Sequence, residues 1–447
     1  MIMEWERLLS NKRLGMEEFH QERKDDRSAF LRDFDRLIFS APFRRLQNKT
    51  QVFPLPGSVF VHNRLTHSLE VSCVGRSLGN SVARSLIEKK SVLNNSFVSE
   101  IGNIVSAACL AHDLGNPPFG HSGEKAIAAY FTDGNGQKLQ GMLCGGAAQW
   151  SDIINFDGNA NAFRLLAHRF LGRRDGGFAM TYSTLASIVK YPYSSVYANG
   201  KHKFGFFDSE ADIYAKIADE LGIFKLSEPG EPLRYVRYPL VYLVEAADDI
   251  CYLLMDLEDA HKLKYISTEE TKVLMMAFID EDGRRHVEEV LNMVSDVNEQ
   301  VSYLRSKLIG LLIRECSKVF IDNDREILNG TFEGSLINNI QPRQREAYKA
   351  CSKISFEKIY HAKEVLDVEL AGFQIITQLL DLMIDAILNP EKEYSKLLIS
   401  RVSSQYEIAS KDLYTRVLAV LDYISGMTDV YALDIYRKIN GNSLPAV

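Results

Sequence analysis

The sequence lacks the features that would cross-link the chain or place it in a membrane. Its 447 residues include only six cysteines, which are scattered and form no C-x-x-C pair. This excludes a cysteine-ligated zinc site and favours a reducing compartment without disulfides. No apolar run approaches the ~18 residues that suggest a membrane span, and the charged N-terminus has no apolar signal-peptide core. We therefore expect a soluble, cytoplasmic protein with no membrane partner.

An excess of positive charge is also missing. The chain has 52 Lys and Arg against 59 Asp and Glu, a net charge of −7. A general nucleic-acid coat or a membrane-surface binder needs a basic excess, so both classes are disfavoured, although a local basic patch stays open. The G-x-x-x-x-G-K-[ST] phosphate loop and the G-x-S-x-G nucleophile motif are absent as well.

Helical periodicity dominates what is there. Apolar residues recur at intervals of three to five over 27–47, a pattern typical of an amphipathic helix. The helix predicted over 101–114 is apolar nearly all round and therefore buried. Other helices are predicted over 67–90 and 156–171, from Ser122, after Pro239, and almost continuously over 268–447 with a break at Asn389-Pro390. The prediction is an all-α protein.

Two stretches interrupt this pattern. Residues 132–160 are rich in glycine and polar residues, so we expect a surface insertion there. The strongly aromatic stretch 191–207 predicts irregular structure or a short hairpin, the most β-structure that we expect. With its lysines, this stretch could also contact a nucleic-acid single strand.

His112 and Asp113 form a His-Asp pair at the end of the buried 101–114 helix. An ionised Asp at that place needs a partner or a metal. The alternative is an ordinary helix C-terminus, with the His near the helix dipole and the Asp in solvent. Because a His-Asp dipeptide arises easily by chance, the surrounding sequence has to decide between them.

Two other segments place polar side chains on helices that are otherwise apolar. His67 opens the helix predicted over 67–90, and Asp248 lies on the long helix after residue 239. Asp248, Tyr252 and Asp256 follow an i, i+4, i+8 spacing, so they share one helical face. Acidic residues inside such a helix are rarely buried without compensation. Together with the His-Asp pair, these segments predict a His₂Asp₂ site for Mn²⁺, Mg²⁺, Fe²⁺ or Zn²⁺.

The order H…HD…D is the pattern of the HD phosphohydrolase superfamily, and the surrounding sequence resembles the bacterial deoxyguanosine triphosphate triphosphohydrolase family within it. The NPPFGHSGE and SGMTDVYAL matches are highly specific, whereas H…HD…D alone identifies only the superfamily. The resemblance covers almost the whole chain from residue 27, in the segments RRLQNKTQVFPL (44–55), NRLTHSLEV (63–71), AHDLGNPPFGHSGE (111–124), FDGNANAFR (156–164), EAADDICYLLMDLEDA (245–260) and DYISGMTDVYALDIY (422–436).

The resemblance implies a fold and a metal site. Residues 1–262 would form an N-terminal arm and an HD-domain helical core, and 263–447 a C-terminal helical region that completes the nucleotide site and the oligomer contacts. The implied metal ligands are His67, His112, Asp113 and Asp248. Asp249 competes for the last place, but Asp248 shares a helical face with Tyr252 and Asp256, as the family pattern has it.

His121 and Glu124 match the catalytic pair of this family. They stand at i and i+3 at a predicted helix start, so the carboxylate can orient the imidazole. Such an arrangement suits proton transfer near neutral pH. In isolation, His121 would more simply be a helix-capping residue in a turn.

The resemblance also implies substrate contacts. Arg64 matches the family's phosphate-contacting arginine, and Gln51 its contact to the sugar 3′-hydroxyl. Tyr252 would pack against the deoxyribose and exclude a 2′-hydroxyl, while Asp256 would help to position the sugar or phosphate. Further contacts are expected from Asn159, Lys190 and Lys203 to the phosphates, and from Glu369 to the base. Taken singly, each lysine could equally be a solvated surface residue.

The function implied is metal-dependent hydrolysis of deoxynucleoside triphosphates to deoxynucleoside and inorganic triphosphate. The alternatives are another HD phosphohydrolase, acting on nucleoside monophosphates or cyclic nucleotides, and a non-catalytic nucleotide-sensing or DNA-binding regulator. Manganese or magnesium is the expected metal, with iron or zinc as alternatives. The family further implies a homo-oligomer, a dNTP effector and binding of single-stranded DNA.

Overall fold

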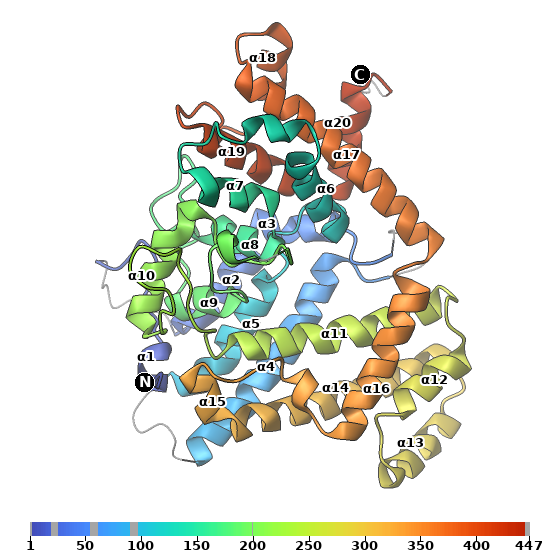
Figure 1. The fold of residues 1–447 in the computed structure, drawn as a ribbon. Coiled ribbons are helices and arrows are strands. Elements are labelled where there is room, and N and C mark those ends of the chain that lie inside the picture. The colour runs from blue at the N-terminus through green and yellow to red at the C-terminus, as the bar shows by residue number, and fades with distance from the viewer. Residues whose placement is uncertain (1, 19–25, 54–60, 90–96, 199, 443–447) are drawn as a thin grey trace.

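Helices account for nearly all the regular structure in the computed structural model, which describes residues 2–18, 26–53, 61–89, 97–198 and 200–442 (Figure 1). Within these ranges only isolated bridge pairs occur, and no strand forms. The described part of 191–207 is largely irregular, with a 3₁₀ turn over Ser195–Tyr197 and two such pairs, Ser194 with Phe206 and Tyr193 with Arg234. The all-α prediction is therefore confirmed.

The α-helices follow one another with connections of very different length, the longest described ones lying between residues 167 and 241. The first ten are α1 Trp5–Leu8, α2 Ala29–Ile38, α3 Ala41–Arg45, α4 Arg64–Glu88, α5 Ile101–Ala111, α6 Gly120–Thr132, α7 Gly146–Ile154, α8 Gly158–Ala167, α9 Tyr182–Ile188 and α10 Ala211–Leu221. The next ten are α11 Val241–Lys262, α12 Thr268–Met276, α13 Glu281–Met293, α14 Val297–Asp322, α15 Asp324–Asn329, α16 Pro342–Ile354, α17 Lys363–Leu388, α18 Glu393–Ser400, α19 Leu413–Ser425 and α20 Asp429–Ile439.

Two hydrophobic cores organise these helices. The first lies among α4, α5, α11 and α14, in the lower half of Figure 1. The second lies among α6, α17 and α19, in the upper half of the same view. The first core contains residues from before and after residue 262, and so does the second. The chain passes from the first core to the second between Leu114 and Ala126, in the connection from α5 to α6 and the start of α6.

The helix starts that carry the site have clear local causes. The side chain of Asn63 accepts a hydrogen bond from the backbone N–H of Thr66, and the side chain of Thr66 accepts one from the backbone N–H of Asn63, so a capping box begins α4 at Arg64. Helix α5 is buried along almost its whole length and ends at Ala111. The turn that follows contains Pro117 and Pro118, which disfavour a continuing helix. This break leaves His112 and Asp113 at the start of the connection between α5, which packs in the first core, and α6, which packs in the second.

Three expectations about helix extent were wrong in part. The stretch 27–47 forms two helices, because Ser40 caps a new helix with Pro42 in its first turn. Residues 132–160 are mostly exposed up to residue 147, as expected of a surface segment, but they also form the 3₁₀ turn Asn135–Leu139 and the helix α7, and Leu139, Leu143 and Ile153 pack into the second core. Residues 268–442 form nine separate α-helices. The break expected at Asn389-Pro390 is confirmed, since α17 ends at Leu388.

One described helix, α17, is long and apolar enough to cross a membrane by length and composition. Half of its apolar stretch is buried inside the protein. It packs against α6, α19 and α20 and contributes Ile376, Leu380 and Ile384 to the second core. We therefore interpret α17 as a helix of the second hydrophobic core.

Candidate active site

Three helices bring two imidazoles and two carboxylates together. His67 lies in the first turn of α4, His112 and Asp113 directly follow α5, and Asp248 lies in α11. Nε2 of His67 is 3.1 Å from Oδ1 of Asp248, and Nε2 of His112 is 3.6 Å from the same oxygen. Oδ1 of Asp113 lies 3.7 Å from Nε2 of His112. Ligand atoms of His67, His112 and Asp113 all lie within 4.8 Å of one another.

This set of donors fits a divalent cation. Ligand atoms about 2.1 Å from one ion lie roughly 3 Å apart when they are at right angles, close to the shorter separations here. Nδ1 of His112 donates to the carbonyl oxygen of Cys109 at 2.6 Å, which orients the ring so that Nε2 faces the cluster. Two imidazoles with two carboxylates suit Mn²⁺, Mg²⁺, Fe²⁺ or Zn²⁺.

Asp248, and not its neighbour Asp249, belongs to this cluster. Burial alone would raise the pKa of Asp248, but the nearby imidazoles of His112 and His67 outweigh it and lower the pKa. Asp249 has no imidazole beside it, and burial together with the charge of Glu245 raises its pKa to about 7. The preference for Asp248 derived from helical spacing therefore matches the geometry.

Asp113 has a second role as the counter-charge of Arg64. Nη1 of Arg64 donates to Oδ2 of Asp113 at 2.7 Å, and both side chains are buried. Burial would raise the pKa of Asp113, but the charges of Arg64, His112 and His67 lower it well below its usual range. The guanidinium also lies against Gly120, where an added Cβ would be 2.5 Å from Nη2. Arg64 thus spans from the metal cluster to the start of α6.

His121 and Glu124 form the expected pair at that helix start. Nδ1 of His121 donates to Oε2 of Glu124 at 2.6 Å, and the other oxygen of Glu124 accepts the backbone N–H of Gly158 at 2.7 Å. Burial would raise the pKa of Glu124, but these hydrogen bonds and the charges of His121 and Lys203 lower it to about 2. Glu124 is therefore ionised at neutral pH and fixes the imidazole tautomer with Nε2 free.

A short chain of contacts connects this pair to the metal cluster. The side-chain amide of Asn116 donates to Oδ1 of Asp113. A Cβ added to Gly158 would lie 2.0 Å from Oδ1 of Asn116 and 2.9 Å from Oε1 of Glu124. Only glycine leaves room for both side chains at this point. The proton-transfer candidates and the ligand candidates are thus neighbours at one site.

Lys203 and Asn159 converge on a buried carboxylate beside Glu124. Nζ of Lys203 lies 3.0 Å from Oδ1 of Asp157 and 3.8 Å from Oε2 of Glu124. The side-chain amide of Asn159 donates to the same Asp157 oxygen at 2.9 Å. A cavity of about 430 Å³ opens here, lined in part by His121, Glu124, Lys125, Lys201, His202 and Lys203. Its size suits part of a nucleotide, and its lysines suit phosphate oxygens.

Tyr252 and Asp256 lie on the face of α11 that turns toward the π-helical turn Ser355–Ile359. The ring of Tyr252 is 6.4 Å from the ring of His67 and 5.9 Å from that of Tyr360. The hydroxyl of Tyr360 donates to Oδ2 of Asp256 at 2.6 Å. Burial raises the pKa of Asp256 to about 8. The two predicted residues are therefore joined by a third, Tyr360, that the sequence did not single out.

The remaining predicted residues lie at the edges of this site. Nζ of Lys190 pairs with Glu245 at 3.2 Å, one helical turn from Asp248. Oε1 of Gln51 is buried with no hydrogen-bond partner in the described part of the chain. The carbonyl oxygen of Glu369, in α17, accepts the hydroxyl of Ser122 at 2.9 Å, next to His121. Among the described residues, no hydrogen bond joins Gln51 or Lys190 to another predicted residue.

Sequence reasoning missed the polar residues that hold the site's loops. Lys49 is buried and donates to the carbonyl oxygens of Asn116, at 2.5 Å, and Ser425, at 2.8 Å. Asp429 accepts the backbone N–H groups of Phe119 and Thr50. The only local signal was that Asp429 lies in the matched SGMTDVYAL segment. Its partners are more than 300 residues away, beyond the reach of any spacing rule.

The sequence matches known protein families and named relatives. Residues 64–142 match the HD domain family and residues 339–438 match the phosphohydrolase-associated domain family. A Synechocystis protein named deoxyguanosinetriphosphate triphosphohydrolase-like protein is 37% identical over 455 residues, which cover 99% of this chain and 100% of the relative. One of the same name from Pseudomonas aeruginosa is 36% identical with the same coverage. A Yersinia pestis deoxyguanosinetriphosphate triphosphohydrolase is 29% identical over 92% of this chain and 93% of its own.

Proposed function

The chain belongs to the deoxyguanosinetriphosphate triphosphohydrolase-like family of HD-domain phosphohydrolases, and from this premise we propose that it hydrolyses deoxynucleoside triphosphates to deoxynucleoside and inorganic triphosphate. The observation that carries the proposal is the His121–Glu124 pair beside the cluster of His67, His112 and Asp113. A site that only binds nucleotides needs no oriented imidazole with a free nitrogen next to a metal cluster.

In the proposed reaction, a water oxygen attacks the α-phosphorus and the bond from that phosphorus to the 5′-oxygen breaks. The 5′-oxygen takes up a proton and leaves as the deoxynucleoside hydroxyl, and triphosphate remains. A divalent cation, Mn²⁺ or Mg²⁺, held by His67, His112, Asp113 and Asp248 supplies positive charge beside the α-phosphate when bound. Nε2 of His121 either accepts the proton of the water or donates one to the 5′-oxygen.

Positive side chains around the pair would hold the phosphates. Arg64 lies between Asp113 and Gly120. Its guanidinium would therefore contact an α-phosphate that reaches both the candidate metal ligands and the His121–Glu124 pair. Lys203 extends this charge into the 430 Å³ cavity, and Asn159 lies beside it. Lys190 would act from the α11 side, where Glu245 holds it. These contacts neutralise charge on the leaving triphosphate.

The sugar and base would lie toward α11 and the C-terminal region, residues 263–447. The buried, unpartnered Oε1 of Gln51 is an acceptor suited to a 3′-hydroxyl. Tyr252, packed on Tyr360, would exclude a 2′-hydroxyl, and Asp256 would position the sugar. The carbonyl oxygen of Glu369 accepts the hydroxyl of Ser122, which directly follows His121, so Glu369 lies near the site. Its side chain would contact the base.

Product analysis tests this function. Each of the four dNTPs, singly and mixed, is incubated with the protein and Mn²⁺ or Mg²⁺, and the products are separated by anion-exchange chromatography. Deoxynucleoside and intact triphosphate in equal amounts are expected. Pyrophosphate or orthophosphate would point to another HD phosphohydrolase, and binding without turnover to a nucleotide-sensing regulator; either result would overturn the proposal.

The family also suggests properties of the whole assembly, which we include in the proposal. These are a cytoplasmic homo-oligomer, a dNTP effector and binding of single-stranded DNA. Analytical ultracentrifugation with and without dNTPs measures the first two together. A gel-shift titration with an oligonucleotide at two salt concentrations measures the third, since phosphate contacts weaken with salt.

A further inference from the structure

A single carboxylate from α20 holds two loops of the site. Oδ1 of Asp429 accepts the backbone N–H of Phe119 at 2.9 Å, and Oδ2 accepts that of Thr50 at 2.8 Å. Asp429 is the first residue of α20, which Thr428 caps, and it is only 9% exposed. The two oxygens of this carboxylate are therefore committed to two segments that are distant in the sequence.

The first of these segments sets the direction of α6. Phe119 has φ 62° and ψ 17°, a left-handed conformation that is unfavourable for a residue with a Cβ. Such a conformation persists only where the surroundings enforce it. Here the N–H of Phe119 is held by Asp429, and its ring presses on Gly372 of α17, where an added Cβ would be 2.6 Å away. His121 follows two residues later.

The second segment carries Gln51, next to Thr50. Its backbone is also tied to the start of α4, because Lys49 accepts the N–H of Arg64 through its carbonyl oxygen at 3.2 Å. Asp429 thus holds the backbone of Thr50, directly before Gln51, the candidate sugar contact. Through Lys49, the same segment is tied to Arg64, three residues before His67. One side chain connects the proton-transfer side of the site with its sugar side.

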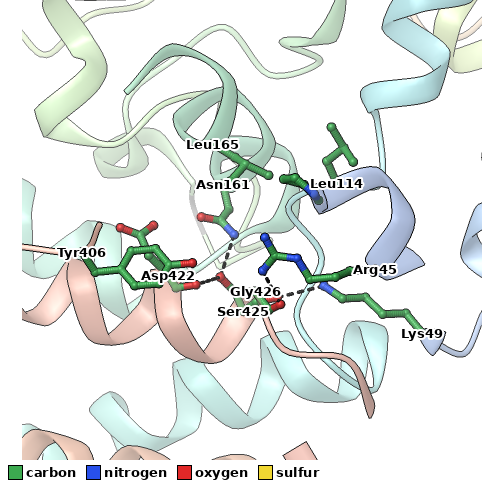
Figure 2. Close-up of a pocket in the computed structure, with 10 residues that line it drawn as sticks. Arg45, Lys49, Leu114, Asn161, Leu165, Tyr406, Asp422, Ser425 and Gly426 are labelled. Atoms are coloured by element: carbon green, nitrogen blue, oxygen red, sulfur yellow. Dashed lines mark hydrogen bonds between the residues drawn. The ribbon is translucent and has the colours of Figure 1, made fainter. Parts of the chain in front are cut away.

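Further hydrogen bonds fix the end of α19, at Ser425 and Gly426, to the segments around it (Figure 2). Nζ of Lys49 donates to the carbonyl oxygen of Ser425, and Arg45 donates to that of Gly426 at 2.8 Å. The side-chain amide of Asn161 donates to the carbonyl oxygen of Gly115 and to the hydroxyl of Ser425. The turn that leads into Asp429 is therefore fixed to the same loops that Asp429 holds.

We propose that Asp429 is a positioning residue of the hydrolase, which places His121 and Gln51 by holding the Phe119 and Thr50 backbones. The inference rests on the proposed function for its kinetic part. Asp429 is not one of the candidate metal ligands or substrate contacts, and both of its carboxylate oxygens accept backbone N–H groups, so it would act through the loop geometry. The C-terminal region thereby supplies part of the active-site framework as well as the candidate base contact.

The experiment compares Asp429→Ala and Asp429→Asn with Asp434→Asn. Asp434 lies on the same helix, is more exposed and pairs only with Lys438 in the described structure, so it is a matched control. We expect Asp429→Ala to lower kcat for dGTP by about 10²-fold, the scale of a small misplacement, with metal content retained. Asp429→Asn keeps the shape and one acceptor and should fall in between. Asp434→Asn should stay within about two-fold of the parent protein.

A double-variant comparison separates positioning from mere support. In the His121→Ala background, Asp429→Ala should cost clearly less activity than in the parent protein, because the part of its effect that passes through His121 is already lost and only the part that passes through Gln51 is left. An equal loss in both backgrounds, or a lower melting temperature with unchanged kcat, would overturn the proposal.

An NMR measurement that needs no activity tests the role of Asp429 independently of the proposed hydrolase function. The imidazole C–H resonances of His121, assigned by their loss in His121→Ala, should move in Asp429→Ala and Asp429→Asn but not in Asp434→Asn. If the protein hydrolyses no dNTP, the proposed function fails and this arm alone decides on Asp429. Unmoved resonances in both Asp429 variants would refute its positioning role whatever the activity.

Discussion

The two carboxylate oxygens of Glu124 accept different hydrogen bonds, one from Nδ1 of His121 at 2.6 Å and the other from the backbone N–H of Gly158 at 2.7 Å. The carboxylate is buried, while the imidazole side chain is 68% exposed. The rigid member of the pair is therefore inside the protein, and the member that would exchange protons faces the cavity.

We predict that His121→Ala lowers kcat by about 10²–10⁴-fold, the usual worth of general acid–base catalysis, with metal content and dNTP affinity retained. Glu124→Gln should lose as much or less, and the double variant should be little worse than His121→Ala. Single-turnover kinetics and metal analysis measure this, with exposed Glu289→Gln as control. Losses that multiply would show that the two residues act independently.

Removing a ligand candidate should have two distinguishable outcomes. His112→Ala should abolish metal content and hydrolysis while the helical circular dichroism persists. Asp113→Ala should do the same and also lower the free energy of unfolding by about 3 kcal/mol, because it leaves the buried Arg64 without its counter-charge. Elemental analysis and urea titration measure these effects, with exposed His286→Ala as control. Normal activity in metal-free Asp113→Ala protein would refute the metal site.

Discrimination against ribonucleotides should depend on Tyr252. Its ring packs between His67 and Tyr360, so truncation would open space beside the sugar. We predict that Tyr252→Ala reduces the ratio of kcat/KM for dGTP over GTP by about ten-fold or more, the scale of a lost packing contact. Tyr252→Phe should retain the preference, and exposed Tyr394→Ala should not change it. An unaltered ratio in a competition assay would place sugar selection elsewhere.

The His62 ion cluster should stabilise the fold in a pH-dependent way. Nδ1 of His62 lies 2.9 Å from Asp259 and Nε2 lies 3.2 Å from Glu70. Burial would lower the pKa of His62, but the two carboxylates raise it to about 10. Because the folded pKa exceeds the ordinary 6.5, this stabilisation is complete below pH 6.5 and is lost as pH rises toward 10.

His62→Gln should therefore cost about 2 kcal/mol of unfolding free energy at pH 6 and progressively less up to pH 10. Urea titrations of both proteins across this range provide the measurement. Groups that titrate equally in both proteins cancel in the difference. A cost that stays constant with pH would mean that the histidine is not charged in the folded state.

Local rules were enough to find the helices that carry the site. Asp248 and Tyr252 share a face because they are four residues apart, and His121 and Glu124 meet because they are three apart. Each of these relations is fixed by helix geometry alone. The all-α class followed from the same periodicity.

Contacts between distant segments were out of reach. The dual use of Asp113, as ligand candidate and as partner of Arg64, depends on how α4 and α5 pack. The segment 132–160 is polar and rich in glycine, but Leu139, Leu143 and Ile153 anchor it by packing into the second core. The left-handed Phe119 is enforced by α17 and α20 from the other end of the chain. None of these leaves a periodic trace in the sequence.

The division between two hydrophobic cores has a consequence for how the protein would lose function. The ligand candidates sit on α4, α5 and α11 of the first core, whereas His121 and Glu124 sit on α6 of the second. Cooperative units of a protein can open separately below its global unfolding transition. If the second core opens first, mild denaturant would abolish activity while a metal bound at the first core stays in place. Activity would then be lost at a lower denaturant concentration than the metal in the same titration.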